Sequence, residues 1–278
     1  MILQDIIKNL YAEIIRDQNL NKNHKYLNDL IQKHGEIKNL LLLKAIVLSK
    51  ISLNNESELL FKKILQNYDN DIDILYNYSI VLRANKKNNE FIDCINNILE
   101  IEKNHLGALN SLGLFYFENK NYQLALDAFN KILNINANSL NALINISNLY
   151  IHQSEFTLAE SVLRKIISLY PDSFLAYYSL GNLYMRSNNI DEAKKNFYKC
   201  ISLNNNFKDA YINLSAVYQE NDEIDEAVSV LKNILKFDAN NEEIIVKIYY
   251  LKSLICDWQS YDNDLKNLLS ISTLNTPV

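Results

Sequence analysis

The amino-acid sequence predicts an all-α fold in which helical hairpins stack into a right-handed α-solenoid with a C-terminal capping helix. Three observations support this prediction. A unit of 34 residues recurs without gaps, apolar residues follow one another at spacings of three and four, and the 278-residue chain has only 4 glycines and 2 prolines. The first observation indicates a repeat architecture, the second indicates helices, and the third indicates short polar turns.

The 34-residue period is clearest between residues 106 and 241, where four units align column by column. One column contains only tyrosine, the next only alanine, the third phenylalanine or leucine, and the fourth glycine or serine. Their members are Tyr116, Tyr150, Tyr184 and Tyr218; Ala125, Ala159, Ala193 and Ala227; Phe129, Leu163, Phe197 and Leu231; and Gly113, Ser147, Gly181 and Ser215. Weaker units continue this register back toward the amino terminus.

Each unit is predicted to form two helices that meet at these columns. Apolar residues in a unit share one helical face, and the small and alanine columns are expected where the two helices approach most closely. Polar pairs between the helices, "NK", "QS", "SN" and "ND", are expected either to cap a helix or to adopt a left-handed conformation. Because one hairpin cannot bury both of its faces, the hairpins must stack, with the first helices lining an inner groove.

The unit resembles the tetratricopeptide repeat (TPR), whose small residues, tyrosine, alanine and stop position occur at these columns. The stop position holds Pro171 in one unit. We therefore predict a divergent helical hairpin at residues 1–37, a TPR superhelix of six units at 38–241, and capping helices with a junction segment at 242–278.

Several function classes are not supported by the sequence. The net charge of −5 gives no basic surface for nucleic acid or an anionic membrane. The four glycines are too scattered for a phosphate-binding loop. Cys94, Cys200 and Cys256 show no metal-ligand spacing, and no acid, base and nucleophile are grouped for catalysis. We expect no catalytic residue, no metal and no cofactor.

The sequence also predicts a cytoplasmic protein without a membrane segment. Asp5 and Lys8 interrupt the apolar stretch that a signal peptide would need at the amino terminus. The longest apolar run, residues 40–48, contains Lys44 and is too short to span a bilayer.

The sixth position of the first helices is the candidate binding column, because six of its seven members are small hydrogen-bonding residues. The column holds Asn9, Leu43, Asn77, Ser111, Asn145, Ser179 and Asn213, and Asn148 and Asn182 lie one turn further. Side-chain amides at repeat spacing are suited to contact the main chain of an extended peptide in the concave groove. The abundance of asparagine in this chain is the alternative explanation.

A clamp for a terminal carboxylate, as in chaperone-binding TPR domains, fits less well. Tyr178 stands where the clamp needs lysine, and Glu242 and Glu243 stand where the next repeat should supply further clamp residues. The repeats around Asn145 and Asn213 instead resemble the asparagine-bearing arms of the protein O-GlcNAc transferases.

The segment "ICDWQSYDNDLKNLLSI" also resembles the junction between the repeat arm and the catalytic region of O-GlcNAc transferases. The matching residues are Cys256, Asp257, Trp258, Tyr261, Asp262, Leu265 and Leu268. The alternative interpretation is that this segment forms an aromatic cap on the last hairpin. This resemblance implies an acceptor-binding arm of a glycosyltransferase, with no catalytic or UDP-binding residue in this chain. The rival hypothesis is a stand-alone scaffold with partners on its convex side or end caps. The sequence also leaves open whether the chain forms a homodimer through its convex face.

Overall fold

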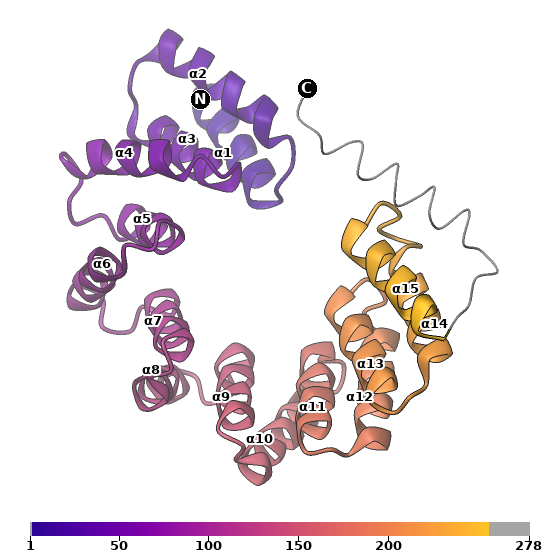
Figure 1. Cartoon of the computed structure of the whole chain (residues 1–278). Coiled ribbons are helices and arrows are strands. Elements are labelled where there is room, and N and C mark those ends of the chain that lie inside the picture. Colours follow the sequence, from indigo (N-terminus) through magenta and orange to yellow (C-terminus); the bar gives the residue numbers. More distant parts are fainter. Residues whose placement is uncertain (1, 256–278) are drawn as a thin grey trace. The chain divides into compact units, whose positions relative to one another are not determined.

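The computed structural model describes residues 2–255, and in this range the chain forms helices joined by turns, with no β-strand (Figure 1). The helices are α1 (Ile2–Ile15), α2 (Leu20–His34), α3 (Lys38–Lys50), α4 (Asn54–Leu65), α5 (Ile72–Ala84), α6 (Asn88–Ile101), α7 (Leu106–Glu118), α8 (Tyr122–Ile135), α9 (Leu140–His152), α10 (Phe156–Leu169), α11 (Phe174–Arg186), α12 (Ile190–Leu203), α13 (Lys208–Glu220), α14 (Ile224–Ile234) and α15 (Glu242–Leu254). The predicted all-α fold is confirmed.

The helices belong to two compact units, Met1–Ile135 and Asn136–Val278, which we call unit 1 and unit 2. Unit 1 contains α1 to α8. Leu27 of α2 and Leu40 of α3 are fully buried in one apolar cluster, and Phe61 of α4 and Ile95 of α6 are fully buried in a second. Among the first helices of successive hairpins, α3 also contacts both α1 and α5.

Unit 2 contains α9 to α15, and its hairpins are packed in the same way. Phe197 of α12, Leu214 of α13 and Leu231 of α14 are fully buried in one cluster, which Ile244 of α15 joins. Helix α11 contacts both α9 and α13, so these three first helices form a continuous wall. We call this surface the first-helix wall.

The small-residue column lies where the two helices of a hairpin meet, as the sequence predicts. A Cβ atom built on Gly113 would lie 2.5 Å from Cε1 of Phe129, and one on Gly181 would lie 2.5 Å from Cε1 of Phe197. These contacts are too short for any side chain larger than hydrogen. The hairpins with serine in this column carry leucine, not phenylalanine, at the facing position, so the two columns complement each other in size.

The turns between paired helices are left-handed, as expected from their polar pairs. Lys120, Ser154, Asn188 and Asp222 have φ angles of 60°, 62°, 60° and 59°. They stand at the same place in four successive hairpins. Asn188 and Asp222 are residue types that tolerate this conformation, so the packing of the helices holds Lys120 and Ser154 in it.

A buried carboxylate joins two hairpins of unit 1. Glu58 of α4 is 6% exposed and accepts hydrogen bonds from Lys87 at 2.6 Å and Asn85 at 2.7 Å, both in the turn after α5. Lys62 lies 2.8 Å from the same carboxylate. Burial alone would raise the pKa of Glu58, but the hydrogen bonds from Lys62, Lys87 and Asn85 outweigh burial and lower this pKa to about 2.

Candidate peptide-binding surface

Unit 2 brings five of the predicted binding residues together on the first-helix wall. We call Asn145, Asn148, Ser179, Asn182 and Asn213 the amide row. Asn145 and Asn148 come from α9, Ser179 and Asn182 from α11, and Asn213 from α13. Because α11 contacts both neighbours, the row crosses three adjacent helices.

Hydrogen bonds join members of the row between helices. The Ser179 hydroxyl donates to Oδ1 of Asn148 at 3.0 Å, and the Asn213 amide donates to Oδ1 of Asn182 at 2.7 Å. Each bond connects residues 31 positions apart in the chain. Residues of the sixth-position column therefore bond to residues one turn further along the preceding first helix. The sequence pattern, which considers each helix separately, did not predict this pairing.

The members of the row differ in exposure. Ser179 is 1% exposed and supports Asn148 from inside the wall. Asn145, Asn148, Asn182 and Asn213 are half-buried, so part of each side chain meets solvent. Since Oδ1 of Asn148 and of Asn182 already accepts a bond, the N–H groups of these two amides are what this surface would offer to a ligand.

Tyr178 is a member of this network that the sequence analysis treated only as a departure from the carboxylate clamp. Its hydroxyl accepts a hydrogen bond from the Asn213 amide at 3.1 Å. Burial raises the pKa of Tyr178, the Asp209 carboxylate raises it further, and the hydrogen bonds with Asn182 and Asn213 act in the opposite direction. The phenol therefore stays neutral and positions Asn213 at physiological pH. The sequence contained a sign of this contact, because Tyr178 precedes Asn182 by one helical turn and side chains at that spacing lie on the same face of a helix.

The column is less uniform in unit 1. Asn77 donates its side-chain amide to the backbone carbonyl of Asp73 in its own helix at 2.8 Å. Leu43 is buried at 3% exposure, Asn9 is exposed and Ser111 is half-buried. The amide of Asn77 is therefore engaged with its own backbone rather than with a neighbouring first helix.

The predicted junction residues Cys256, Asp257, Trp258, Tyr261 and Asp262 lie outside the described residues. Helix α15, which precedes them, is capped by Asn241, whose Oδ1 accepts from the Ile244 amide at 3.0 Å.

The described residues show neither a metal-binding cluster nor a membrane-spanning helix. Among residues 2–255, no group of three or more His, Cys, Asp and Glu side chains is placed to hold a metal ion. In the same range, every helix is too short or too polar to cross a membrane. His105 has a structural contact instead, since its Nδ1 accepts from the Ala108 amide at 3.0 Å at the start of α7.

Two family patterns match the sequence. The family described as tetratricopeptide repeat protein 21 second ARM domain matches residues 54–222, and the tetratricopeptide repeat matches residues 208–241. Among curated proteins, none matches this chain.

Solved structures of three proteins have similar folds. A tetratricopeptide repeat protein from Parabacteroides merdae ATCC 43184 has a TM-score of 0.73 at 19% identity, over 90% of this chain and 98% of its own. Yeast Tom70 has a TM-score of 0.75 at 15% identity, over 93% of this chain and 55% of its own. PilW, a widely conserved type IV pilus biogenesis factor, has a TM-score of 0.62 at 16% identity, over 77% of this chain and 99% of its own. These similarities confirm the predicted solenoid of TPR hairpins.

Proposed function

Because this chain belongs to the family described as tetratricopeptide repeat protein 21 second ARM domain, a family of protein-interaction repeats, we propose that it binds an extended protein segment along the first-helix wall of unit 2. The amide row is the surface that would make the contacts. The N–H groups of Asn148 and Asn182 would donate to main-chain carbonyls of the bound segment, so that binding depends little on the sequence of that segment.

The observation that carries this proposal is the pair of bonds from Ser179 to Asn148 and from Asn213 to Asn182. These bonds fix the orientation of amides that remain partly exposed, so less side-chain entropy is lost when a ligand binds. A row of preoriented donors suits a main chain, because extended peptides present carbonyls at regular intervals.

The test uses a peptide selected from a displayed random library on the wild-type protein, with its affinity measured by fluorescence polarisation. Replacing both Asn148 and Asn182 by Ala removes two donors, and we expect the affinity to fall about tenfold, since each hydrogen bond contributes about 0.5–1.5 kcal/mol. Asn233→Ala, on the exposed part of α14, is the matched control and should bind like the wild type. Unchanged affinity in the double variant, with unchanged helicity, would rule the amide row out.

A more specific proposal is that this protein is the acceptor-binding arm of an O-GlcNAc-transferase-like enzyme. It rests on the sequence resemblance of residues 256–262 and of the repeats around Asn145 and Asn213. Sequencing the gene beyond the codon for Val278 tests it. An in-frame or adjacent region encoding sugar-nucleotide-binding lobes is the expected result, whereas unrelated neighbouring genes would favour a stand-alone TPR scaffold.

A further inference from the structure

A second surface of unit 2 lies between the second helices of two hairpins. A pocket of about 750 Å³ opens between α10 and α12, and we call it the α10–α12 groove. Tyr177, Leu180 and Tyr184 of α11 line it between the two outer helices, and Ile167 of α10 adds a further apolar side chain. The groove therefore has an apolar floor supplied by a first helix and walls supplied by two second helices.

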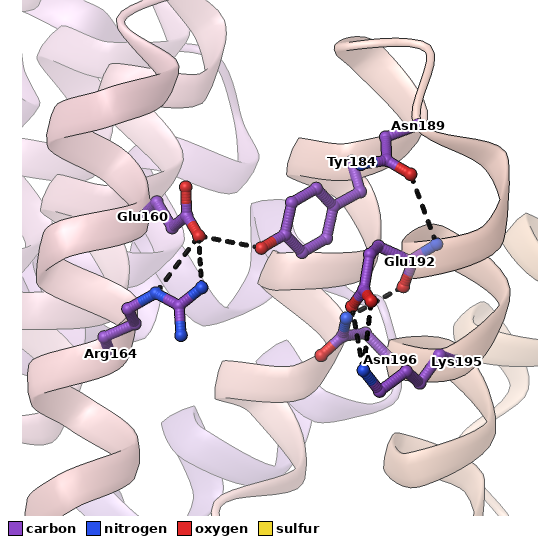
Figure 2. Close-up of polar contacts among 7 residues, drawn as sticks. All are labelled: Glu160, Arg164, Tyr184, Asn189, Glu192, Lys195 and Asn196. Atoms are coloured by element: carbon purple, nitrogen blue, oxygen red, sulfur yellow. Dashed lines mark hydrogen bonds and ion pairs between the residues drawn. The ribbon is translucent and has the colours of Figure 1, made fainter.

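The wall on α10 carries a carboxylate that is already engaged. Oε1 of Glu160 accepts hydrogen bonds from the Tyr184 hydroxyl at 2.8 Å and from the Arg164 guanidinium at 2.6 and 3.1 Å (Figure 2). These bonds lower the pKa of Glu160 below its ordinary value. Glu160 therefore stays ionised and fixes the position of Arg164 at the edge of the groove.

The wall on α12 has a similar arrangement. The Lys195 ammonium lies 3.0 Å from the Glu192 carboxylate. The backbone at Glu192 is held by side chains, since Asn189 accepts from its N–H at 3.4 Å and Asn196 donates to its carbonyl at 2.8 Å (Figure 2). Each wall thus pairs one cation with one anion of the same helix.

The cations are more exposed than their partners. The side chains of Arg164 and Lys195 are 70% and 73% exposed, while those of Glu160 and Glu192 are 32% and 40% exposed. Figure 2 shows Arg164 and Lys195 extending from opposite walls into the gap between the helices. Exposed ion pairs within one helix are weak, so both cations stay available to a second carboxylate.

From this arrangement we infer that the α10–α12 groove binds an acidic peptide segment. A carboxylate of the peptide would lie between Arg164 and Lys195, and an adjacent apolar side chain would pack on Leu180 and Tyr177. The guanidinium supplies a planar pair of donors for the carboxylate and the ammonium adds a point charge. This site is separate from the amide row and does not depend on it.

The next hairpin has a different arrangement at the equivalent positions. Tyr198 takes the position of Arg164, and its hydroxyl shares a 2.7 Å hydrogen bond with the hydroxyl of Tyr218, the counterpart of Tyr184. Lys194, the counterpart of Glu160, lies 4.4 Å from the centre of the Tyr218 ring and forms an ion pair with Glu223 at 2.6 Å. A tyrosine at this position therefore puts a neutral pair of hydroxyl groups where the α10–α12 groove has the Arg164 cation.

Unit 1 provides a similar groove whose cations, Lys103 and Lys131, lie at other positions. A pocket of about 520 Å³ is lined by Leu109, Leu112 and Tyr116, which occupy the columns of Tyr177, Leu180 and Tyr184. Asn96 stands in place of Arg164, and Asp127 stands in place of Lys195. The positions of the cations on the two walls, rather than the shape alone, distinguish the groove of unit 2.

The binding test uses a fluorescein-labelled peptide of alternating glutamate and leucine, with amidated and acetylated ends, and fluorescence polarisation as the readout. We expect the full-length protein to bind it with an affinity that falls as salt is raised. The R164Q/K195Q variant should lose at least tenfold in affinity, and R164Y, which copies the next hairpin, should lose as much. The control K165Q/K232Q removes two exposed cations elsewhere on second helices and should bind normally.

A gain-of-function variant completes the test. Introducing N96R/D127K into the R164Q/K195Q protein should restore binding, because it places the two cations on the equivalent groove of unit 1. Failure to restore binding, equal affinity for a peptide with glutamine in place of glutamate, or unchanged affinity of R164Q/K195Q would each overturn the inference. The N148A/N182A variant should bind this acidic peptide normally, which separates this site from the amide row. Circular dichroism checks that every variant keeps its helices.

Discussion

The side-chain amide nitrogen of Asn213 lies 2.7 Å from the side-chain amide oxygen of Asn182, and this contact joins α13 to α11 through polar groups of two successive hairpins. Apolar contacts between hairpins depend mainly on buried area and tolerate small shifts. A hydrogen bond between two short side chains is directional, so it fixes the relative position of these helices more tightly.

We predict that Asn182 and Asn213 are energetically coupled. In a double-mutant cycle, N182A and N213A should show a coupling free energy of about 0.5–1.5 kcal/mol, because either substitution alone already breaks the bond. Urea unfolding followed by circular dichroism gives the four free energies of unfolding. The pair N182A and N233A, whose side chains come from separate parts of unit 2, should be additive. Additive behaviour of N182A with N213A would mean that the bond does not contribute in solution.

A second prediction concerns the contact between Gly181 and Phe197. Replacing Gly181 by Ser puts a Cβ atom 2.5 Å from the Phe197 ring and should destabilise unit 2 by about 1–3 kcal/mol. Combining it with F197L reproduces the Ser–Leu pair that residues 147 and 163 form in another hairpin. The double variant should therefore be more stable than the sum of the two single effects indicates.

Thermal and urea unfolding of the four proteins measure this compensation. S147G is the matched control, since glycine facing leucine creates no clash and should cost roughly 1 kcal/mol or less through helix propensity. If G181S were as stable as the wild type, the close approach of α11 and α12 at this column would be contradicted.

The hairpins and their columns could be predicted from the sequence because each column is determined by contacts inside one unit that then recur. Gly181 with Phe197 is such a case, and so is the left-handed turn at Ser154. The bond between Asn182 and Asn213 could not be predicted, because it depends on how one hairpin is rotated against the next. Tertiary packing also decides the burial of Glu58, which in the sequence looks like an ordinary solvated helix residue.

The buried carboxylate leads to a third prediction, on acid stability. The pKa of Glu58 falls from an ordinary value of 4.5 to about 2 in the folded protein. Its contribution to stability is therefore fully present above pH 4.5 and is lost as the pH falls from 4.5 toward 2. The loss should reach roughly 3 kcal/mol, and E58Q should remove this part of the pH dependence.

The measurement for Glu58 is the free energy of unfolding as a function of pH, taken from urea titrations between these two pH values. E90Q is the matched control, because Glu90 lies 3.7 Å from the same lysines but is 49% exposed. It should keep the wild-type slope. An E58Q protein with the same acid slope as the wild type would show that Glu58 is not held ionised by its partners.

A fourth prediction concerns the buried thiols. Cys200 is 0% exposed and Cys94 is 8% exposed, and burial raises the pKa of each thiol to about 12. In a C256S background we expect neither thiol to react with Ellman's reagent at pH 8 on the timescale of minutes, because the thiolate fraction is about one in ten thousand. Adding urea past the unfolding transition should release both. Rapid reaction of the folded protein would show that these helices open locally.

The size complementarity between the glycine–serine and phenylalanine–leucine columns limits how this protein can be recombined. A chimera cut at the turn inside a hairpin joins a first helix from one repeat to a second helix from another, and half of such joins between neighbouring repeats would set serine against phenylalanine. A cut placed between hairpins keeps every matched pair intact. Duplication, deletion or transplantation of repeats should therefore succeed when whole hairpins are moved as modules.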